Sequence, residues 1–257
     1  MVLAYKDSPY LEACIQSLLA QTRKSRIIIT TSTPNSHIEN IVRKYDIEMI
    51  VNDHCGSIAS DWNFAFNQSP TGLLTLAHQD DIYLPEYGES VIAALNASPD
   101  SLIAFTDYEE LVAETQRKNT ACLIVKRLLL WPFYLKKSWK STLIKKLILY
   151  PGNSICCPAV SFNKSNLEGF EFNPDFTVNL DWDAWLNIAN IKGSFTFISR
   201  ILMQHRLNPD NETAASLREN RRQQEDSTIF LRLWPAFVAR TLSYLYALSY
   251  LKEKYDK

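Results

Sequence analysis

The chain has 257 residues and a formal net charge of -1 at pH 7, and its 46% hydrophobic content is enough for a substantial apolar core, which excludes a disordered protein. No secretory leader is predicted, and no stretch of 18 residues is apolar and uncharged enough to predict a membrane span. The five cysteines are odd in number and lack metal-ligand spacing, so buried thiols and a cytoplasmic localisation are expected.

The first predicted elements alternate between strand and helix. A short apolar opening at 2–5 leads through a turn into a helix, three isoleucines within 26–30 predict a second strand, and hydroxyl and turn-forming residues follow it at 31–35. A helix over about 37–45 and a strand over 48–51 come next. This alternation predicts an α/β fold with a parallel, doubly wound sheet, in which the loops that follow the strands gather along one edge.

A buried strand that stops at two carboxylates lies within 72–87, GLLTLAHQDDIYLPEY. Its apolar run is typical of a central parallel strand, and Asp80 and Asp81 come just after it. Ligands of open α/β sheets bind at the carboxyl ends of strands, so these acids are candidate ligands of a divalent cation that bridges phosphate oxygens. The alternative is that they only cap the helix that begins near Pro85. A third aspartate, Asp107, ends a strand predicted at 101–105, where a turn residue is the simpler interpretation.

The middle of the chain is basic. Residues 115–167 contain no acidic residue and ten basic ones, so the rest of the chain carries a net charge of -11. An amphipathic helix is predicted in this segment, with its lysines off the apolar face. The predicted apolar face consists of Trp139, Leu143, Ile144, Leu147 and Ile148, and the lysines off it are Lys140, Lys145 and Lys146.

Several partners fit a basic, aromatic-rich, amphipathic segment. It is typical of a contact with an anionic membrane surface, predicted for 115–150. A helical hairpin packed on the sheet and a dimer surface remain alternatives. Nucleic acid is not expected as a partner, because the apolar residues outnumber what tracking of phosphates requires.

A second acidic cluster, NLDWDAWLNIAN, lies within 176–190. Asp181 and Asp183 open a predicted helix, where carboxylates are also common for electrostatic reasons alone. A last strand is predicted at 196–203 and is followed by Gln204, His205 and Arg206. The tail from 218 onward predicts a charged helix and then an apolar, aromatic one.

Taken in chain order, these segments resemble the inverting glycosyltransferases of family 2, which have the nucleotide-binding GT-A fold. AYKDSPYLEACIQSLLAQT is similar to the family's first strand, turn and helix, and RIIITTSTPN resembles its second strand and nucleotide-facing loop. GSIASDWNFAF resembles the helix that leads to the metal motif, and LAHQDD resembles the aspartate-x-aspartate element itself. NLDWDAWL is similar to the acidic base motif, and HRLNPDNET to the late arginine, histidine and threonine segment. The matches span residues 4–213.

The chain departs from the family pattern at two positions of the site. His78 stands at the first position of the metal motif, where the family has aspartate, while Asp80 matches the second aspartate and Asp81 the extra one. Thr31 to Thr33 stand where many members carry an acid that contacts the base, which leaves the nucleotide open.

The resemblance implies a donor site, a metal site and a general base. The implied donor is a nucleotide-diphosphate sugar, UDP- or dTDP-linked, and the implied metal is manganese or magnesium, with Asp80, Asp81 and His205 as ligands. Asp181 is the first choice of general base and Asp183 the second. The residues expected at the nucleotide sugar are Ala4, Tyr5, Thr31, Ser32, Asn63, His78 and Gln79.

The implied organisation is a GT-A domain at 1–210 with a C-terminal helical extension at 211–257. Within the domain, 1–110 forms the nucleotide-sugar half, 111–150 the basic amphipathic insertion and 151–210 the acceptor half. The expected acceptor is a glycan or a lipid-linked glycan in polysaccharide biosynthesis, with peripheral contact at the cytoplasmic membrane face. Two alternatives are a sugar nucleotidyltransferase, although 4–9 lack the glycine-rich, lysine-bearing phosphate loop expected of one, and a non-catalytic binding subunit.

Overall fold

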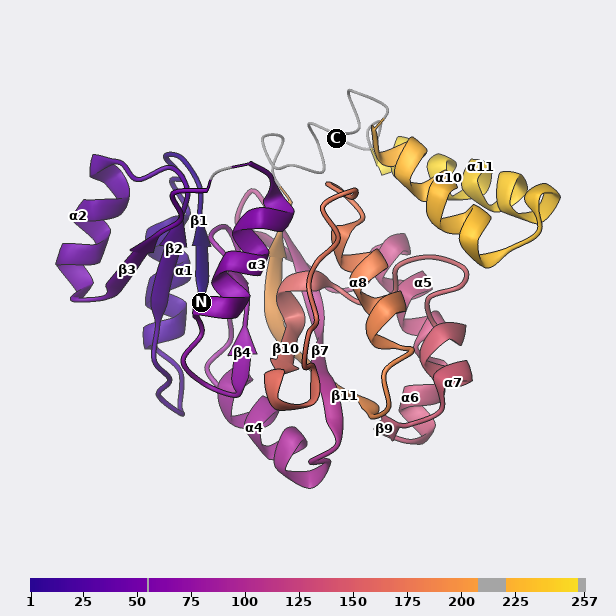
Figure 1. Cartoon of the computed structure of the whole chain (residues 1–257), viewed down its shortest axis with the longest axis horizontal. Helices are drawn as coiled ribbons and strands as arrows, with labels where there is room; N and C mark the ends of the chain where they lie inside the picture. Colours follow the sequence, from indigo (N-terminus) through magenta and orange to yellow (C-terminus); the bar gives the residue numbers. More distant parts are fainter. Residues whose placement is uncertain (55, 208–220, 254–257) are drawn as a thin grey trace.

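The computed structural model describes residues 1–54, 56–207 and 221–253, and within them the strands form two sheets (Figure 1). The first sheet is parallel throughout and has the order β3-β2-β1-β5. Its strands are β1 (Val2–Ala4), β2 (Ile28–Thr31), β3 (Glu48–Val51) and β5 (Ala77–His78). The helices α1 (Leu11–Leu19), α2 (Ser36–Tyr45) and α3 (Ile58–Gln68) alternate with these strands along the chain. The prediction of a parallel α/β sheet flanked by helices is confirmed.

Side-chain caps set where two of these helices begin. Oδ1 of Asn35 accepts a hydrogen bond from the main-chain N of Ile38 at the start of α2, and the hydroxyl of Ser57 accepts one from Ser60 at the start of α3. At the other end of α2, Asp46 adopts the left-handed region with a φ of 50°, which turns the chain directly into β3.

The second sheet is mixed and has the order β4-β10-β7-β11-β6. Its two long strands, β7 (Ser101–Val112) and β11 (Ser194–Arg206), run parallel to each other. The shorter strands β4 (Leu73–Thr75), β10 (Val160–Asn163) and β6 (Ile82–Tyr83) pair antiparallel, as do β8 (Thr115–Arg117) with β7 and β9 (Ser138–Trp139) with β11. A strand was predicted over the residues of β4, although not its antiparallel pairing, whereas β6, β8 and β9 were not predicted, because two or three residues are too few for a periodic pattern to show.

One run of chain belongs to both sheets. Residues 73–75 form β4 in the second sheet, Leu76 is buried between the sheets, and 77–78 form β5 in the first. The main chain of Met1 bonds to Thr75 on one side of this switch and to Ala77 on the other, at 3.0 and 2.8 Å. The predicted strand within 72–87 therefore joins the two halves of the protein.

The remaining helices surround the second sheet. They are α4 (Tyr87–Ala97), α5 (Ala121–Leu129), α6 (Trp131–Leu135), α7 (Thr142–Leu147), α8 (Leu180–Ile188), α10 (Arg221–Leu233) and α11 (Ala236–Glu253), with the short 3-10 turns Cys157–Ala159 and Lys164–Asn166. Figure 1 shows α5, α6 and α7 together at one side of the molecule, and α10 and α11 as a helical pair beyond α8. No helix in the described parts of the chain has the length and apolar character needed to cross a bilayer.

Aromatic packing joins the last two helices to the domain. The buried ring of Trp182 in α8 lies 5.1 Å from the ring of Phe230 in α10 and 5.6 Å from that of Tyr246 in α11, measured between centroids. Contacts of this kind bury large apolar area, so α10 and α11 stabilise the helix that carries the second acidic cluster.

The predicted amphipathic face in the basic segment is wrong at three positions. Lys145 is fully buried, and its ammonium donates hydrogen bonds to the carbonyl oxygens of Ile191 and Gly193 at 2.8 and 2.9 Å. Leu143 and Leu147 are exposed instead. Two carbonyl acceptors satisfy the buried ammonium, and this tertiary arrangement outweighs the hydrophobic pattern of α7, which is only six residues long.

Candidate active site

The loop between β5 and β6 brings the first acidic pair to the end of β11. Because β5 is parallel to β1 and β2, its carboxyl end lies at the same edge of the sheet as theirs. β6 pairs antiparallel with the last residues of β11, with Ile82 opposite Gln204. Asp80 and Asp81 therefore lie beside His205 and Arg206, two segments that the sequence separates by more than 120 positions.

Asp81 is fully buried, and one of its carboxylate oxygens is held by the end of β11. Oδ1 accepts a hydrogen bond from Nδ1 of His205 at 3.0 Å and another from the main-chain N of Arg206 at 2.8 Å. Oδ2 is buried as well and has no hydrogen-bond partner among the described residues. A buried carboxylate oxygen without a partner is energetically unfavourable, and a bound cation would supply the missing interaction.

Three side chains converge here, that of Asp81 among them. His78, Asp80 and Asp81 each offer one ligand atom, and these atoms lie within 4.8 Å of one another. Nε2 of His78 is buried and, like Oδ2 of Asp81, finds no hydrogen-bond partner in the described part of the chain. One nitrogen and two carboxylate oxygens fit a divalent cation, so the residues present suit the predicted metal. His78, which was expected at the nucleotide sugar, lies in this group of candidate metal ligands.

Burial shifts the protonation of this cluster. It lowers the pKa of His78 to about 4, so the imidazole is neutral at pH 7 and has a lone pair available for a metal. Burial and the charge of Asp81 raise the pKa of Asp80 to about 6. Two carboxylates this close repel each other, and a divalent cation would relieve that repulsion.

His205 is placed as the partner of Asp81 and is not one of the three converging residues. Burial acts to lower the pKa of His205, but the charge and hydrogen bond of Asp81, together with the charge of Asp80, raise it overall. His205, predicted as a metal ligand, is hydrogen-bonded to the carboxylate of Asp81 in this structure, and its role as a ligand stays a prediction. Residues 208–213 of the same predicted motif lie outside the described residues.

Arg206 is buried next to the pair formed by Asp81 and His205, and it contacts the loop between β5 and β6. Its Nε donates to the carbonyl oxygen of Asp80 at 3.0 Å, and its guanidinium lies 4.3 Å from the ring centroid of Tyr10. The same side chain forms an ion pair with Glu114, in the turn between β7 and β8. These contacts fix the main chain of the acidic pair.

The predicted nucleotide residues at the first sheet lie along its carboxyl edge. Ala4 ends β1 and is buried, and the side chain of Tyr5 beyond it is 50% exposed. The side chain of Gln79 pairs with the main chain of Tyr5 through both amide atoms, at 2.9 and 3.0 Å. Gln79 therefore continues the pairing of β1 with β5 by one step, and its amide is occupied in shaping this edge.

The loop after β2 contacts an aspartate that the sequence analysis missed. The hydroxyl of Ser32 donates to Asp61 at 2.8 Å, and Nδ2 of Asn52, just after β3, donates to the other oxygen of Asp61 at 2.8 Å. Thr31 is buried, and its hydroxyl accepts from the main-chain N of Thr33. Asp61 thus places a carboxylate at the edge where the loop of Thr31 to Thr33 lacks the expected acid.

Asn63 is hydrogen-bonded to the segment that precedes α8. Its amide exchanges two hydrogen bonds with the main chain of Phe172, at 2.9 and 2.7 Å. Both polar atoms of this side chain therefore hold the segment that precedes α8.

The two acids of the second cluster have different surroundings. Oδ2 of Asp181 accepts a hydrogen bond from Nδ2 of Asn153 at 2.7 Å, and burial raises the pKa of Asp181 above its ordinary value. Asp183 is fully buried, forms an ion pair with Arg232 in α10 and accepts from Asn187 at 2.8 Å. Asp183 therefore anchors α10.

Cys157 and Lys126 interact electrostatically with residues of both acidic clusters. Burial raises the pKa of the Cys157 thiol, and the charges of Asp181 and Asp81 raise it further, so both carboxylates lie close enough to act on one thiol. The charge of Lys126 lowers the pKa of both Asp181 and His205, against the dominant effect of burial for Asp181. In the sequence Lys126 is only one of ten basic residues within 115–167, because nothing in the pattern of α5 marks it as facing inward.

Solved structures share this fold. The protein is similar to the crystal structure of S. aureus TarS 1-349, with a TM-score of 0.64 and 12% sequence identity over 94% of this chain and 68% of that chain. The structure of TarS 1-349 in complex with UDP-GlcNAc has a TM-score of 0.61 and 13% identity over 94% and 69% of the two chains. The mannosyltransferase PcManGT from Pyrobaculum calidifontis, in complex with GDP-Man and Mn2+, has a TM-score of 0.62 and 13% identity over 96% and 67%.

These low identities show only the fold, so the family of the chain has to come from a comparison of its sequence. No curated protein sequence matches the chain. A family profile described as Glycosyl transferase family 2 matches residues 1–166, a range that contains the first sheet, the cluster of His78, Asp80 and Asp81, and the inward-facing Lys126. Because the match covers more than half of the chain, and the fold agrees with GT-A glycosyltransferases, the chain belongs to glycosyl transferase family 2 and is a glycosyltransferase.

Proposed function

We propose that this glycosyltransferase transfers a sugar from a nucleotide-diphosphate donor to a glycan or lipid-linked acceptor, with inversion at the anomeric carbon. The observation that carries the proposal is the buried Oδ2 of Asp81, which lacks a partner among the described residues and converges with His78 and Asp80 at the carboxyl edge of the parallel sheet. TarS in complex with UDP and with UDP-GlcNAc, and PcManGT in complex with GDP-Man and Mn2+, support a nucleotide sugar and a divalent metal. UDP- and dTDP-sugars are the proposed donors.

His78, Asp80 and Asp81 would hold manganese or magnesium. When bound, the cation supplies positive charge that stabilises the diphosphate as it leaves the sugar. His205 and Arg206 contribute by holding Oδ1 of Asp81, which leaves Oδ2 without a hydrogen-bond partner among the described residues. The affinity for the metal is therefore expected to depend on these two hydrogen bonds as well as on the ligands.

Asp181 is the proposed general base. Its carboxylate accepts the proton of the acceptor hydroxyl as that oxygen attacks the anomeric carbon, on the face opposite the leaving diphosphate, and a single displacement inverts the configuration. Burial raises the pKa of Asp181, which favours uptake of a proton, and Asn153 fixes the orientation of the carboxylate. Asp183 remains the second choice, because its two oxygens are occupied by Arg232 and Asn187.

The proposal extends to where the enzyme works. A lipid-linked acceptor of polysaccharide biosynthesis would be met at the cytoplasmic face of a membrane, with peripheral contact through 115–150. A sugar nucleotidyltransferase and a non-catalytic subunit are the alternatives, and both predict that no sugar passes from a nucleotide sugar to an acceptor.

A donor panel with manganese tests the proposal. The expected result is stabilisation by one sugar nucleotide in thermal shift, and slow release of its nucleotide diphosphate by the wild-type enzyme. Asp181→Asn should lower turnover about a hundredfold or more and leave donor affinity unchanged. Asp175→Asn, an exposed acid on the preceding loop, is the matched control and should behave as wild type. If Asp181→Asn retains most of its turnover, Asp181 is not the base.

A further inference from the structure

We propose that α5, α6 and α7 form one docking face for an anionic lipid bilayer, with their apolar side chains at the acyl boundary and their lysines at the headgroups. This apolar-basic face is defined by Ile124, Leu128, Trp131, Leu135, Leu143 and Leu147, together with Lys136, Lys137 and Lys146. The inference rests on the proposed function only in one respect: docking would bring the enzyme to a lipid-linked acceptor.

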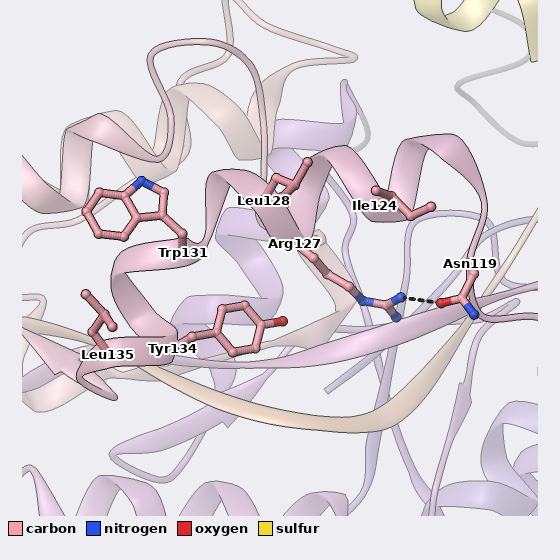
Figure 2. A pocket seen from close by; sticks show the side chains of 7 residues that line it. All are labelled: Asn119, Ile124, Arg127, Leu128, Trp131, Tyr134 and Leu135. Atoms are coloured by element: carbon pink, nitrogen blue, oxygen red, sulfur yellow. Dashed lines mark hydrogen bonds between the residues drawn. The ribbon is translucent and has the colours of Figure 1, made fainter.

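The first observation is that the structure turns large apolar side chains outward on three successive helices. Leu128 is 66% exposed, Leu135 76% and Leu143 67%. In α7 it is Lys145 that is buried, while Leu143 faces outward. Between α5 and α6 lies a hollow of about 530 Å³ (Figure 2). Its walls carry Ile124, Leu128, Trp131 and Leu135, and Arg127 reaches across toward Asn119. Apolar exposure gathered in this way is typical of an interaction site.

The second observation is the charge around these side chains, which selects the occupant. The stretch 115–167 has no acidic residue, and Lys136, Lys137 and Lys146 have no carboxylate within 4.0 Å among the described residues. A second copy of this chain docked here about a twofold axis would bring these lysines face to face. Anionic headgroups would neutralise them, while the apolar side chains enter the boundary below.

The third observation is that α5, which carries part of this face, is connected to the candidate active site through Lys126 and Tyr108. α5 points Ile124 and Leu128 outward and Lys126 inward, where the ammonium donates to the hydroxyl of Tyr108 at 3.0 Å. The ring of Tyr108 packs 6.1 Å from the ring of His205, the partner of Asp81. A bilayer against α5 would therefore lie one helix away from the metal cluster, and an acceptor held in that bilayer would approach the site beside Lys126.

Flotation with lipid vesicles tests the proposal without any substrate. Wild-type protein should float with vesicles that contain phosphatidylserine at low salt, and less at high salt or with phosphatidylcholine alone. The double variant Leu128→Glu and Leu135→Glu should lose about tenfold or more in partitioning for each leucine. Leu73→Glu, a partly exposed leucine in β4, is the matched control and should float as wild type.

A charge series completes the test. Lys136→Gln and Lys146→Gln should each weaken partitioning about fivefold, whereas Lys24→Gln, far along the chain in an exposed loop, should not. The proposal is overturned if wild-type protein does not float with anionic vesicles at low salt, or if the Leu128 and Leu135 variant floats as well as wild type. It is also overturned if that variant converts a dimer to a monomer in ultracentrifugation. If wild-type protein floats with anionic vesicles but shows no transferase activity, the proposed function is contradicted and the docking face is retained.

Discussion

Nδ1 of His205 lies 3.0 Å from Oδ1 of Asp81, although 124 positions separate the two residues in the sequence. The end of β11 thereby holds one oxygen of a buried carboxylate and leaves the other for a ligand. The acidic pair and the late histidine were predicted as parts of one metal site, and the structure brings them together, with His205 hydrogen-bonded to Asp81.

Replacement of Asp81 tests the metal site. Asp81→Asn should abolish measurable binding of Mn2+ in isothermal titration calorimetry, because it removes a charged ligand at the point of convergence. His205→Ala, which removes only the partner of that ligand, should weaken binding about ten- to a hundredfold. Asp175→Asn should bind Mn2+ as wild type, and unchanged affinity in Asp81→Asn would exclude this cluster as the site.

The ion pair between Asp183 and Arg232 is predicted to be structural. Arg232→Met should lower the free energy of unfolding by about 1.5–3 kcal/mol, because it leaves a buried carboxylate with only Asn187 as partner. Arg240→Met, on the exposed side of α11, should have little effect in the same urea titration. A transfer rate that falls tenfold without loss of stability would instead assign Asp183 to catalysis.

Asn63 is predicted to act through the segment before α8. Asn63→Ala should reduce the free energy of unfolding by about 1–3 kcal/mol, since two main-chain groups of Phe172 lose their partner, while the donor affinity of the remaining folded protein stays within twofold. Asn67→Ala, exposed on the same helix, is the control for changes in helix propensity. Weaker donor binding at unchanged stability would place Asn63 at the nucleotide sugar after all.

Because Lys145 is buried, we expect the free energy of unfolding to change with pH in the alkaline range. Burial lowers the pKa of Lys145 from 10.5 to about 8. Between these values the unfolded chain binds more protons than the folded one, so stability should rise with pH by at most about 1.4 kcal/mol per unit. Urea unfolding at several pH values within that window should show the slope in wild type and in Lys146→Met. The slope should be lost in Lys145→Met, and an equal slope there would assign it to another group.

The parallel half of the fold was predictable because its strands and helices are each encoded within a few neighbouring residues. The isoleucines of β2, the cap at Asn35 and the abrupt end of a buried strand at Asp80 and Asp81 are local signals. The resemblance to the family was then recognised from the order of the motifs along the chain.

What the sequence left open depends on tertiary contacts. Nothing local distinguishes Lys145, which is buried, from Lys146, which is half-exposed. The pairing of Gln79 with Tyr5 and of Asp61 with Ser32 joins side chains to distant segments, and a single sequence carries no signal for such contacts. The different surroundings of Asp181 and Asp183 arise in the same way, because Arg232 approaches from a helix about fifty residues further along.

The strand shared by the two sheets limits how this enzyme can move. Since residues 73–78 hydrogen-bond to β10 at one end and to β1 at the other, a hinge between the halves would have to break backbone pairing on either side of Leu76. The two sheets are therefore expected to behave as one rigid block. Any ordered entry of donor before acceptor would have to arise from side chains and surface loops, on the faster timescales of such motions.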